Sequence, residues 1–184
     1  RPVPPRSETR VDAQAPAEVD VHYVANGGLV LLHPFFAPLF QKLALLGVDR
    51  RLVETSVPRA VHLLQFLVTG RLDHVEHELV LAKLLCGVDA HVAVPREVAI
   101  APHELVECET LLTAAIAHWA ALGTTSPGGL REGFLLRPAR LAREGVAFLL
   151  QVERRAHDVL LDRIPWSFSM IRLSWMKAPL RVVW

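Results

Sequence analysis

The 184-residue sequence has no run of apolar residues long enough for a membrane-spanning helix, which needs about 18 of them. The longest candidate, Gly27 to Phe40, is interrupted by His33, Pro34 and Pro38. A signal peptide is also missing, because the first residues have no apolar core, and the sequence does not begin with Met. We therefore expect no membrane partner and interpret the chain as the C-terminal part of a longer protein.

An excess of charge of one sign is lacking too. The 20 Lys and Arg residues are matched by 19 Asp and Glu residues, so the formal net charge is +1. Nucleic acid is therefore not an expected partner. The arginines around Arg137 have acidic neighbours, which predicts a solvated or salt-bridged face. Cysteine is scarce, and Cys86 and Cys108 lie in apolar helical patterns, which favours reduced, buried thiols and folding in the cytoplasm.

The motifs of common catalytic and nucleotide-binding sites are also absent. Ser126–Gly129 lacks the lysine of a phosphate-binding loop, and Asn26–Gly28 lacks the GxGxxG spacing. Neither cysteine has the electropositive surroundings that favour a thiolate. Glutamates near residue 104 stand early in a predicted helix, where the helix dipole explains them. We expect no enzyme activity and no cofactor.

Nine histidines raise one alternative, in which His74, His77 and Cys86 bind a metal ion. A fourth ligand would then come from His91, His103 or Cys108. Structural zinc sites usually bring paired ligands at two ends, and the His-Glu-x-x-His pattern is missing, so we favour a solvated first helical turn for the two histidines. The alternative function is a small metal-dependent hydrolase or cargo effector. It predicts stoichiometric zinc and a pocket that joins the three side chains.

Hydrophobic periodicity predicts helices first and strands afterwards. The predicted helices cover residues 29–46, 57–68, 75–86 and 102–122, with a short one after Ser126. Alternation predicts a strand near 19–23, a hairpin over 141–152 and short strands at 167–173 and 180–184. The prediction is an α+β fold, mainly helical in the N-terminal two thirds, with a small antiparallel sheet in the C-terminal third. Residues 1–18 are predicted to be an extended arm or linker, and residues 19–184 one globular domain.

The C-terminal segment is unusually rich in aromatic residues. Hydrophobic residues make up 52% of the chain, its mean hydropathy is +0.31, and three of its four tryptophans follow Asp162. Each tryptophan carries about 150–250 Å² of surface that must be covered by this chain or by another. The surplus of apolar residues indicates an oligomer or a larger assembly. The candidates for protein contact are Phe35, Phe36, Trp166, Met170, Trp175, Met176 and Trp184.

Several segments, taken together and in order, resemble the tape measure protein family of contractile injection systems. The resemblance covers residues 21–184 and departs from the family pattern at Ala82, Ser174 and Val183. The segments that carry it are Asn26–Phe35, Ala60–Gly70, Leu81–Gly87, His118–Trp119, Thr125–Phe134, Ile164–Trp166, Leu173–Met176 and Trp184.

The resemblance implies a structural component of a phage-tail-like particle, whose tube length is set by an extended protein inside the tube. A helical ruler rises about 1.5 Å per residue, and no long uniform helix is predicted here. The resemblance therefore implies that this chain is the C-terminal anchoring end and that the ruler lies upstream. The implied partners are tube, hub or spike proteins, in a homo-oligomer of three or six copies. The implied location is the particle, in the tube lumen or at its end, after assembly in the cytoplasm.

Overall fold

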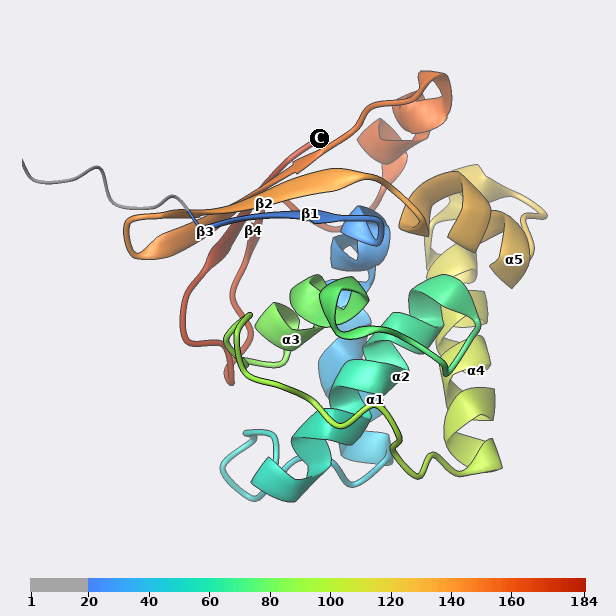
Figure 1. Cartoon of the computed structure of the whole chain (residues 1–184). Coiled ribbons are helices and arrows are strands. Elements are labelled where there is room, and N and C mark those ends of the chain that lie inside the picture. The colour runs from blue at the N-terminus through green and yellow to red at the C-terminus, as the bar shows by residue number, and fades with distance from the viewer. Residues whose placement is uncertain (1–19) are drawn as a thin grey trace, which may run out of the picture.

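Helices and a five-stranded sheet form two layers in the computed structural model, which describes residues 20–184 (Figure 1). Most helices precede the C-terminal strands and lie on one side of the sheet. The predicted α+β class is confirmed. The arm or linker predicted over residues 1–18 lies outside the described residues.

The bounds of the elements follow the predicted periods closely. The helices, with 3₁₀ and π segments written as η, are η1 (Gly27–Phe35), α1 (Phe36–Lys42), η2 (Glu54–Ser56), α2 (Val57–Thr69), η3 (Glu76–Leu79), α3 (Val80–Leu85), α4 (Pro102–His118), η4 (Ala120–Leu122), α5 (Pro127–Leu130), η5 (Arg131–Leu135) and η6 (Ala156–Arg163). The strands are β1 (Val21–Val24), β2 (Ala139–Glu144), β3 (Ala147–Val152), β4 (Met170–Ile171) and β5 (Leu180–Val183).

The predicted helix over 29–46 is split into the 3₁₀ segment η1 and the α-helix α1. Pro34 lies inside η1 and has no N–H to donate, which works against a continuous α-helical ladder there. The glycines at the start of η1 allow very close packing. A Cβ atom on Gly28 would lie 1.8 Å from the carbonyl oxygen of Phe134, so only glycine lets η1 approach η5 this closely.

Helix α4 begins and ends at residues whose chemistry suits those positions. Pro102 occupies its first turn, and the Glu104 carboxylate accepts a hydrogen bond from the Ala101 N–H at 2.8 Å. The helix ends at His118, earlier than the predicted Leu122, because Trp119 leaves the helical conformation with ψ of 73°. The Trp119 side chain is buried and donates its Nε1–H to the Leu160 carbonyl at 3.1 Å.

The sheet has the order β1-β2-β3-β5-β4 and is mixed, which corrects the prediction of a wholly antiparallel sheet. Strand β1 pairs antiparallel with β2, with Val21 opposite Ala142, and β2 and β3 form the predicted hairpin. Strand β5 runs parallel to β3. A parallel pair needs a long crossover, and residues 153–179 supply it by passing through η6 and β4 before β5 begins. The alternation of apolar and polar residues within each strand does not specify the path of this crossover, so the sequence did not reveal the parallel pairing.

The hydrophobic core lies between the helices and the inner face of the sheet. Leu141, Leu150 and Leu180 come from three neighbouring strands and are all buried. One continuous cluster joins them to the buried residues of α2, α3 and α4. The helical layer and the sheet therefore share a single core within the described residues.

Candidate functional site

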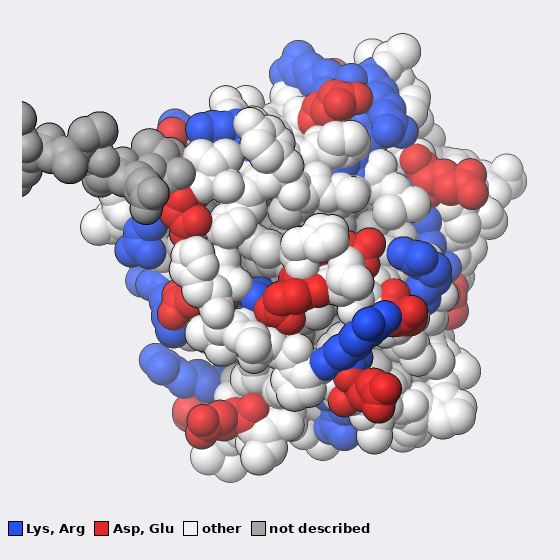
Figure 2. Space-filling view, in the orientation of Figure 1, with Lys and Arg blue, Asp and Glu red and all other residues white. Residues whose placement is uncertain are grey.

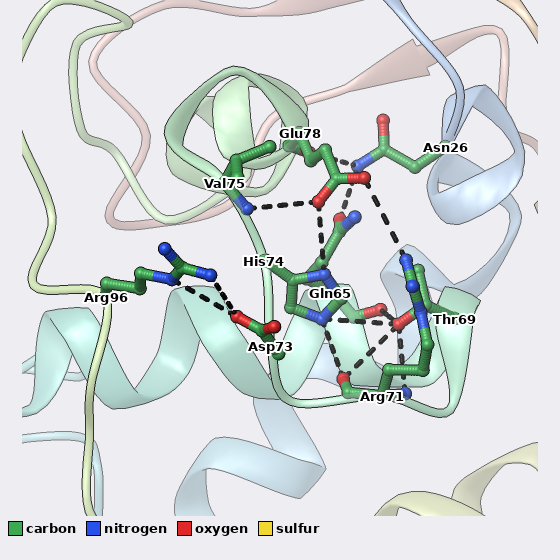
Figure 3. Close-up of polar contacts among 9 residues, drawn as sticks. All are labelled: Asn26, Gln65, Thr69, Arg71, Asp73, His74, Val75, Glu78 and Arg96. Atoms are coloured by element: carbon green, nitrogen blue, oxygen red, sulfur yellow. Dashed lines mark hydrogen bonds and ion pairs between the residues drawn. The ribbon is translucent and has the colours of Figure 1, made fainter.

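His74 is the buried histidine of the proposed metal set; its Nε2 has hydrogen-bond partners within the fold, whereas its Nδ1 is buried without a hydrogen bond and faces a carboxylate. Its Nε2 lies 2.7 Å from the Arg71 carbonyl oxygen and 3.3 Å from the Thr69 hydroxyl, while its Nδ1 lies 3.5 Å from a Glu78 carboxylate oxygen (Figure 3). These contacts connect the end of α2 to η3. The ring therefore stabilises a turn, and the solvated position that we predicted for His74 is wrong.

The other two residues of that set do not join His74. His77 is exposed, and Cys86 is buried. Within residues 20–184, the group of three or more His, Cys, Asp or Glu side chains with ligand atoms close enough to share an ion consists of Asp20, His22 and His91. The structure therefore gives no support to a zinc site at His74, His77 and Cys86.

Both cysteines are in environments that keep them protonated. Burial raises the pKa of the Cys86 thiol far above its ordinary value. Burial, together with the charge of Glu109, raises the pKa of Cys108 to about 12. A thiolate is the reactive form of cysteine, so neither residue is set up as a nucleophile at neutral pH.

A cavity of about 510 Å³, lined by polar and apolar side chains, lies beside the His74 turn, between β1, α2 and η3. Asn26 and Gln65 line it, and the Asn26 amide donates to the Gln65 side-chain oxygen at 2.7 Å (Figure 3). The Asn26 Oδ1 atom is buried without a hydrogen-bond partner. The cavity thus offers amide groups and the Glu78 carboxylate, but it contains neither cysteine. We find no nucleophile–base pair in this part of the described chain.

The histidine–carboxylate cluster lies at the start of β1. Oδ1 of Asp20 is 2.9 Å from Nε2 of His22, and Oδ2 of Asp20 is 3.3 Å from Nε2 of His91. Sequence reasoning considered His91 only as a partner of His74 and missed the other two residues. The available signal was the Asp-x-His spacing in a predicted strand, because alternate strand residues point to the same face.

The three C-terminal tryptophans direct their indole N–H groups into the domain. Trp166 donates to the Leu31 carbonyl at 2.9 Å, Trp175 to the Leu85 carbonyl at 2.8 Å and Trp184 to the Asp158 carboxylate at 2.9 Å. Trp175 and Trp184 are each 9% exposed. Most of the surface of these two rings is therefore covered by this chain itself.

The remaining contact candidates differ in exposure. Phe36 and Met176 are buried in the core, and Phe35 is half-buried with its ring edge-on to Trp166 at 5.3 Å between centroids. Met170 is 54% exposed on the edge strand β4. Met170 is thus the most accessible of the candidates, and Phe35 and Trp166 are both partly exposed.

An apolar surface that the sequence did not single out lies along α4, which we call the α4 groove. Two adjoining hollows of about 580 and 170 Å³ share Thr110 and Ala114, and the second extends over α1. Val106 is 62% exposed there. The signal in the sequence was a series of small residues at steps of three and four along the outer face of the helix. The apolar and small residues lining the groove are Phe35, Pro38, Leu39, Leu105, Val106, Thr110, Leu111, Thr113, Ala114 and Ala117.

Arg137 is fully buried, although the sequence placed it on a solvated or salt-bridged face. Its guanidinium donates to both Asp158 carboxylate oxygens, to the Gly133 carbonyl at 2.8 Å and to the Glu153 carbonyl at 3.1 Å. It also lies 5.5 Å from the centroid of the Trp184 ring. The ion pair is confirmed, and its burial makes it an internal support for the C-terminus.

The surface drawn in Figure 2 has Lys and Arg interspersed with Asp and Glu, and neither sign forms a large patch on this face. None of the helices in residues 20–184 combines the length and the apolar character needed to cross a membrane. The accessible features of residues 20–184 include the apolar α4 groove, the cavity beside His74 and a small histidine–carboxylate cluster.

Comparison with known proteins assigns the family. A family model for the contractile injection system tape measure protein matches residues 2–184. Comparisons with curated proteins and with solved structures give no significant match. The model covers nearly the whole chain and agrees with the resemblance carried by the segments between Asn26 and Trp184. The chain therefore belongs to the contractile injection system tape measure protein family.

Proposed function

We propose that residues 20–184 are the C-terminal anchoring domain of the tape measure protein and that they dock to tube, hub or spike proteins through the α4 groove. The particle then holds three or six copies of the domain, in the tube lumen or at its end. The observation that supports this proposal best is an apolar groove on a domain whose aromatic C-terminus is already buried. The proposal assigns a packing role to the domain and no reaction.

The helices of this domain are too short to measure a tube. The longest one described, α4, has 17 residues, which at 1.5 Å per residue amounts to about 26 Å. The other helices are shorter and fold back on one another around one core. A shape of this kind suits an attachment point better than an extended ruler.

The α4 groove has the composition of a protein interface. Its floor consists of apolar and small side chains, and charged pairs lie along its borders. Lys42 pairs with Glu107 at 2.6 Å, and Arg131 pairs with Glu109. Protein interfaces typically have an apolar centre and a polar rim. We propose Phe35 as the aromatic contact from the predicted set, because it lines this groove.

The other predicted contact residues take different roles in this proposal. Trp175, Trp184, Phe36 and Met176 hold the domain together, because their side chains are buried. Met170 lies on the sheet edge and is proposed as a secondary contact. Trp166 supports the groove indirectly, since its ring packs on Phe35.

Binding measurements with the separate particle proteins test the proposal. The chain is mixed with tube, hub and spike proteins, and complexes are detected by co-purification and by light scattering. We expect one of them to bind, and Ala114→Arg to weaken that binding at least about 30-fold, because Ala114 lines both parts of the groove.

The matched control is Val146→Arg, which places the same charge at the 86%-exposed tip of the β2–β3 hairpin. It should bind like the unchanged chain. Equal binding by the Ala114→Arg variant would rule out the α4 groove as the docking surface. Absence of binding to all three proteins would contradict the anchoring role.

A further inference from the structure

Two histidines and one aspartate meet where the sheet edge touches the loop after α3. We propose that Asp20, His22 and His91 bind one divalent transition-metal ion of the Zn²⁺ type. The three side chains each offer a ligand atom, and these atoms all lie within 4.8 Å of one another. This site is separate from the α4 groove and from the cavity beside His74, and it does not depend on the anchoring role.

The spacing of the ligand atoms suits a tetrahedral ion. Zinc–nitrogen distances of about 2.0–2.1 Å and tetrahedral angles put neighbouring ligand atoms about 3.3 Å apart. The Asp20 carboxylate lies 2.9 Å from Nε2 of His22 and 3.3 Å from Nε2 of His91. Two of the separations are therefore close to those of a tetrahedral site, and the His22 and His91 ligand atoms, which lie within 4.8 Å of each other, would draw together around an ion.

One ring nitrogen lacks the partner that its burial calls for. Nε2 of His22 is buried and has no hydrogen bond, although Asp20 Oδ1 is 2.9 Å away, so the orientation is unsuitable for one. A buried polar nitrogen without a partner costs free energy. A bound ion would satisfy this nitrogen through its lone pair.

The backbone at all three positions is held by the fold. Strand β1 pairs with β2, placing His22 opposite Leu141, and the Asp20 carbonyl accepts from the Arg143 N–H at 3.2 Å. The loop that carries His91 is held on both sides, because the buried Lys83 ammonium donates to the carbonyls of Ala90 and Val92. The backbone is therefore already ordered at these positions before an ion binds.

The ligand types select the kind of ion. Two imidazoles with one carboxylate suit Zn²⁺, Co²⁺ or Ni²⁺, whereas Ca²⁺ and Mg²⁺ prefer all-oxygen sites. The His91 side chain is 77% exposed, so water would complete the coordination. The bound ion would connect the sheet edge to the loop after α3 in the helical layer, and its role would be structural.

Titration of the full chain with Zn²⁺ alone, after stripping with a chelator and dialysis, tests the site. We expect about one ion per chain and a rise in the unfolding temperature with zinc, because the ion binds the folded state preferentially. His91→Ala should lower zinc affinity at least about 100-fold, since losing a ligand costs more than losing an outer-shell partner. Co²⁺ should give the visible absorption of a tetrahedral site in the unchanged chain and lose it in this variant.

The matched control is His77→Ala, which removes another exposed histidine outside the cluster. It should bind zinc and cobalt like the unchanged chain. His22→Gln is a second ligand variant, and its folding is checked by thermal unfolding without metal. Binding of less than about one ion per ten chains, or equal losses in the His91 and His77 variants, would overturn the proposal.

Discussion

The C-terminal segment Ile164–Trp184 and the outer face of α4 are both rich in apolar residues, yet the fold uses them in opposite ways. In the segment, Trp175 and Trp184 are each 9% exposed. On α4, Val106 is 62% exposed and lies on a groove open to solvent. The two indole rings that look suited to a partner are therefore covered by this chain, whereas the outer face of α4 is left open.

The difference between the two regions lies in polar partners as much as in hydrophobicity. Each indole N–H of the segment donates to an acceptor within the domain, such as the Leu85 carbonyl for Trp175. Those hydrogen bonds fix the rings internally, since a buried N–H needs an acceptor. The side chains on the outer face of α4 include valine, threonine and alanine, and a flat partner could cover them without leaving a buried indole unpaired.

Removing the C-terminal segment should have the largest effect. A chain that ends before Ile164 loses β4 and β5. Strand β3, which lies in the middle of the sheet, then becomes an edge strand, unpaired on one side. We expect no cooperative thermal unfolding transition, measured by near-ultraviolet circular dichroism. The control is Met170→Ala, which changes an exposed residue of the same segment and should cost less than about 0.5 kcal/mol. A truncated chain that still unfolds cooperatively would show that the segment is an accessory.

Removing the buried guanidinium of Arg137, which packs on the Trp184 ring, should have the next largest effect on stability. Arg137→Met should reduce the free energy of unfolding by about 3–5 kcal/mol, because it leaves the Asp158 carboxylate without its charged partner and removes a donor from two carbonyl groups. Urea denaturation provides the measurement. Arg140→Met is the control, since Arg140 is less buried and its guanidinium donates to the Gln151 side-chain oxygen at 3.1 Å. Similar losses in the two variants would contradict the internal role of Arg137.

Contact between the segment and α3 depends on a glycine. Gly87 has φ of +76°, and a Cβ atom there would lie 2.3 Å from the Trp175 carbonyl oxygen. Gly87→Ala should cost about 1–2 kcal/mol for the left-handed backbone and about 1–3 kcal/mol for the overlap. Gly70→Ala, at φ of +67° with its nearest neighbour at 3.5 Å, should cost only the first amount. If both variants lost the same free energy of unfolding, the Trp175 backbone would have to move away from residue 87 at no cost in stability.

Acid should weaken the C-terminal contacts through Asp158. Burial raises the pKa of this carboxyl, but hydrogen bonds from Arg137, the Arg155 N–H and Trp184 lower it by more, so it lies below the ordinary value of 3.8. The folded state then binds the proton less tightly than the unfolded state, and the stabilisation is complete above pH 3.8 and lost as the pH falls through the folded pKa. Urea midpoints between about pH 5 and about pH 2 should fall less steeply in Asp158→Asn than in the unchanged chain. Parallel curves would remove Asp158 from the acid response.

Much of the fold was predictable, because the informative signals are local. The period of residues 57–68 and the Gly70 end of α2, the hairpin with its Gly145 turn and the Ser126 cap all match the structure, with Ser126 accepting from the Gly129 N–H. Each of these depends on neighbours within one element. The parallel pairing of β5 with β3 depends on the path of residues 153–179, which no local pattern specifies.

Predictions for sites were less successful for the same reason. His74 and Cys86 are near each other in the sequence, whereas Asp20 and His91 come together only in the fold. The burial of Arg137 likewise depends on η6, which brings Asp158 to it from twenty-one residues away. The C-terminal tryptophans were predicted to contact another protein, whereas the rings of Trp175 and Trp184 are covered by side chains of this chain that are distant in the sequence.

The outer face of α4 should show the smallest effect on folding. Val106→Lys should change the free energy of unfolding by less than about 0.5 kcal/mol, because the side chain is exposed and lysine favours helices more than valine does. Leu112→Lys, on the buried face of the same helix, should unfold the domain, since Leu112 is 0% exposed. Urea denaturation of both variants measures the contrast. A large loss in Val106→Lys would mean that the groove is part of the domain's own packing, and the comparison between α4 and the C-terminal segment would then fail.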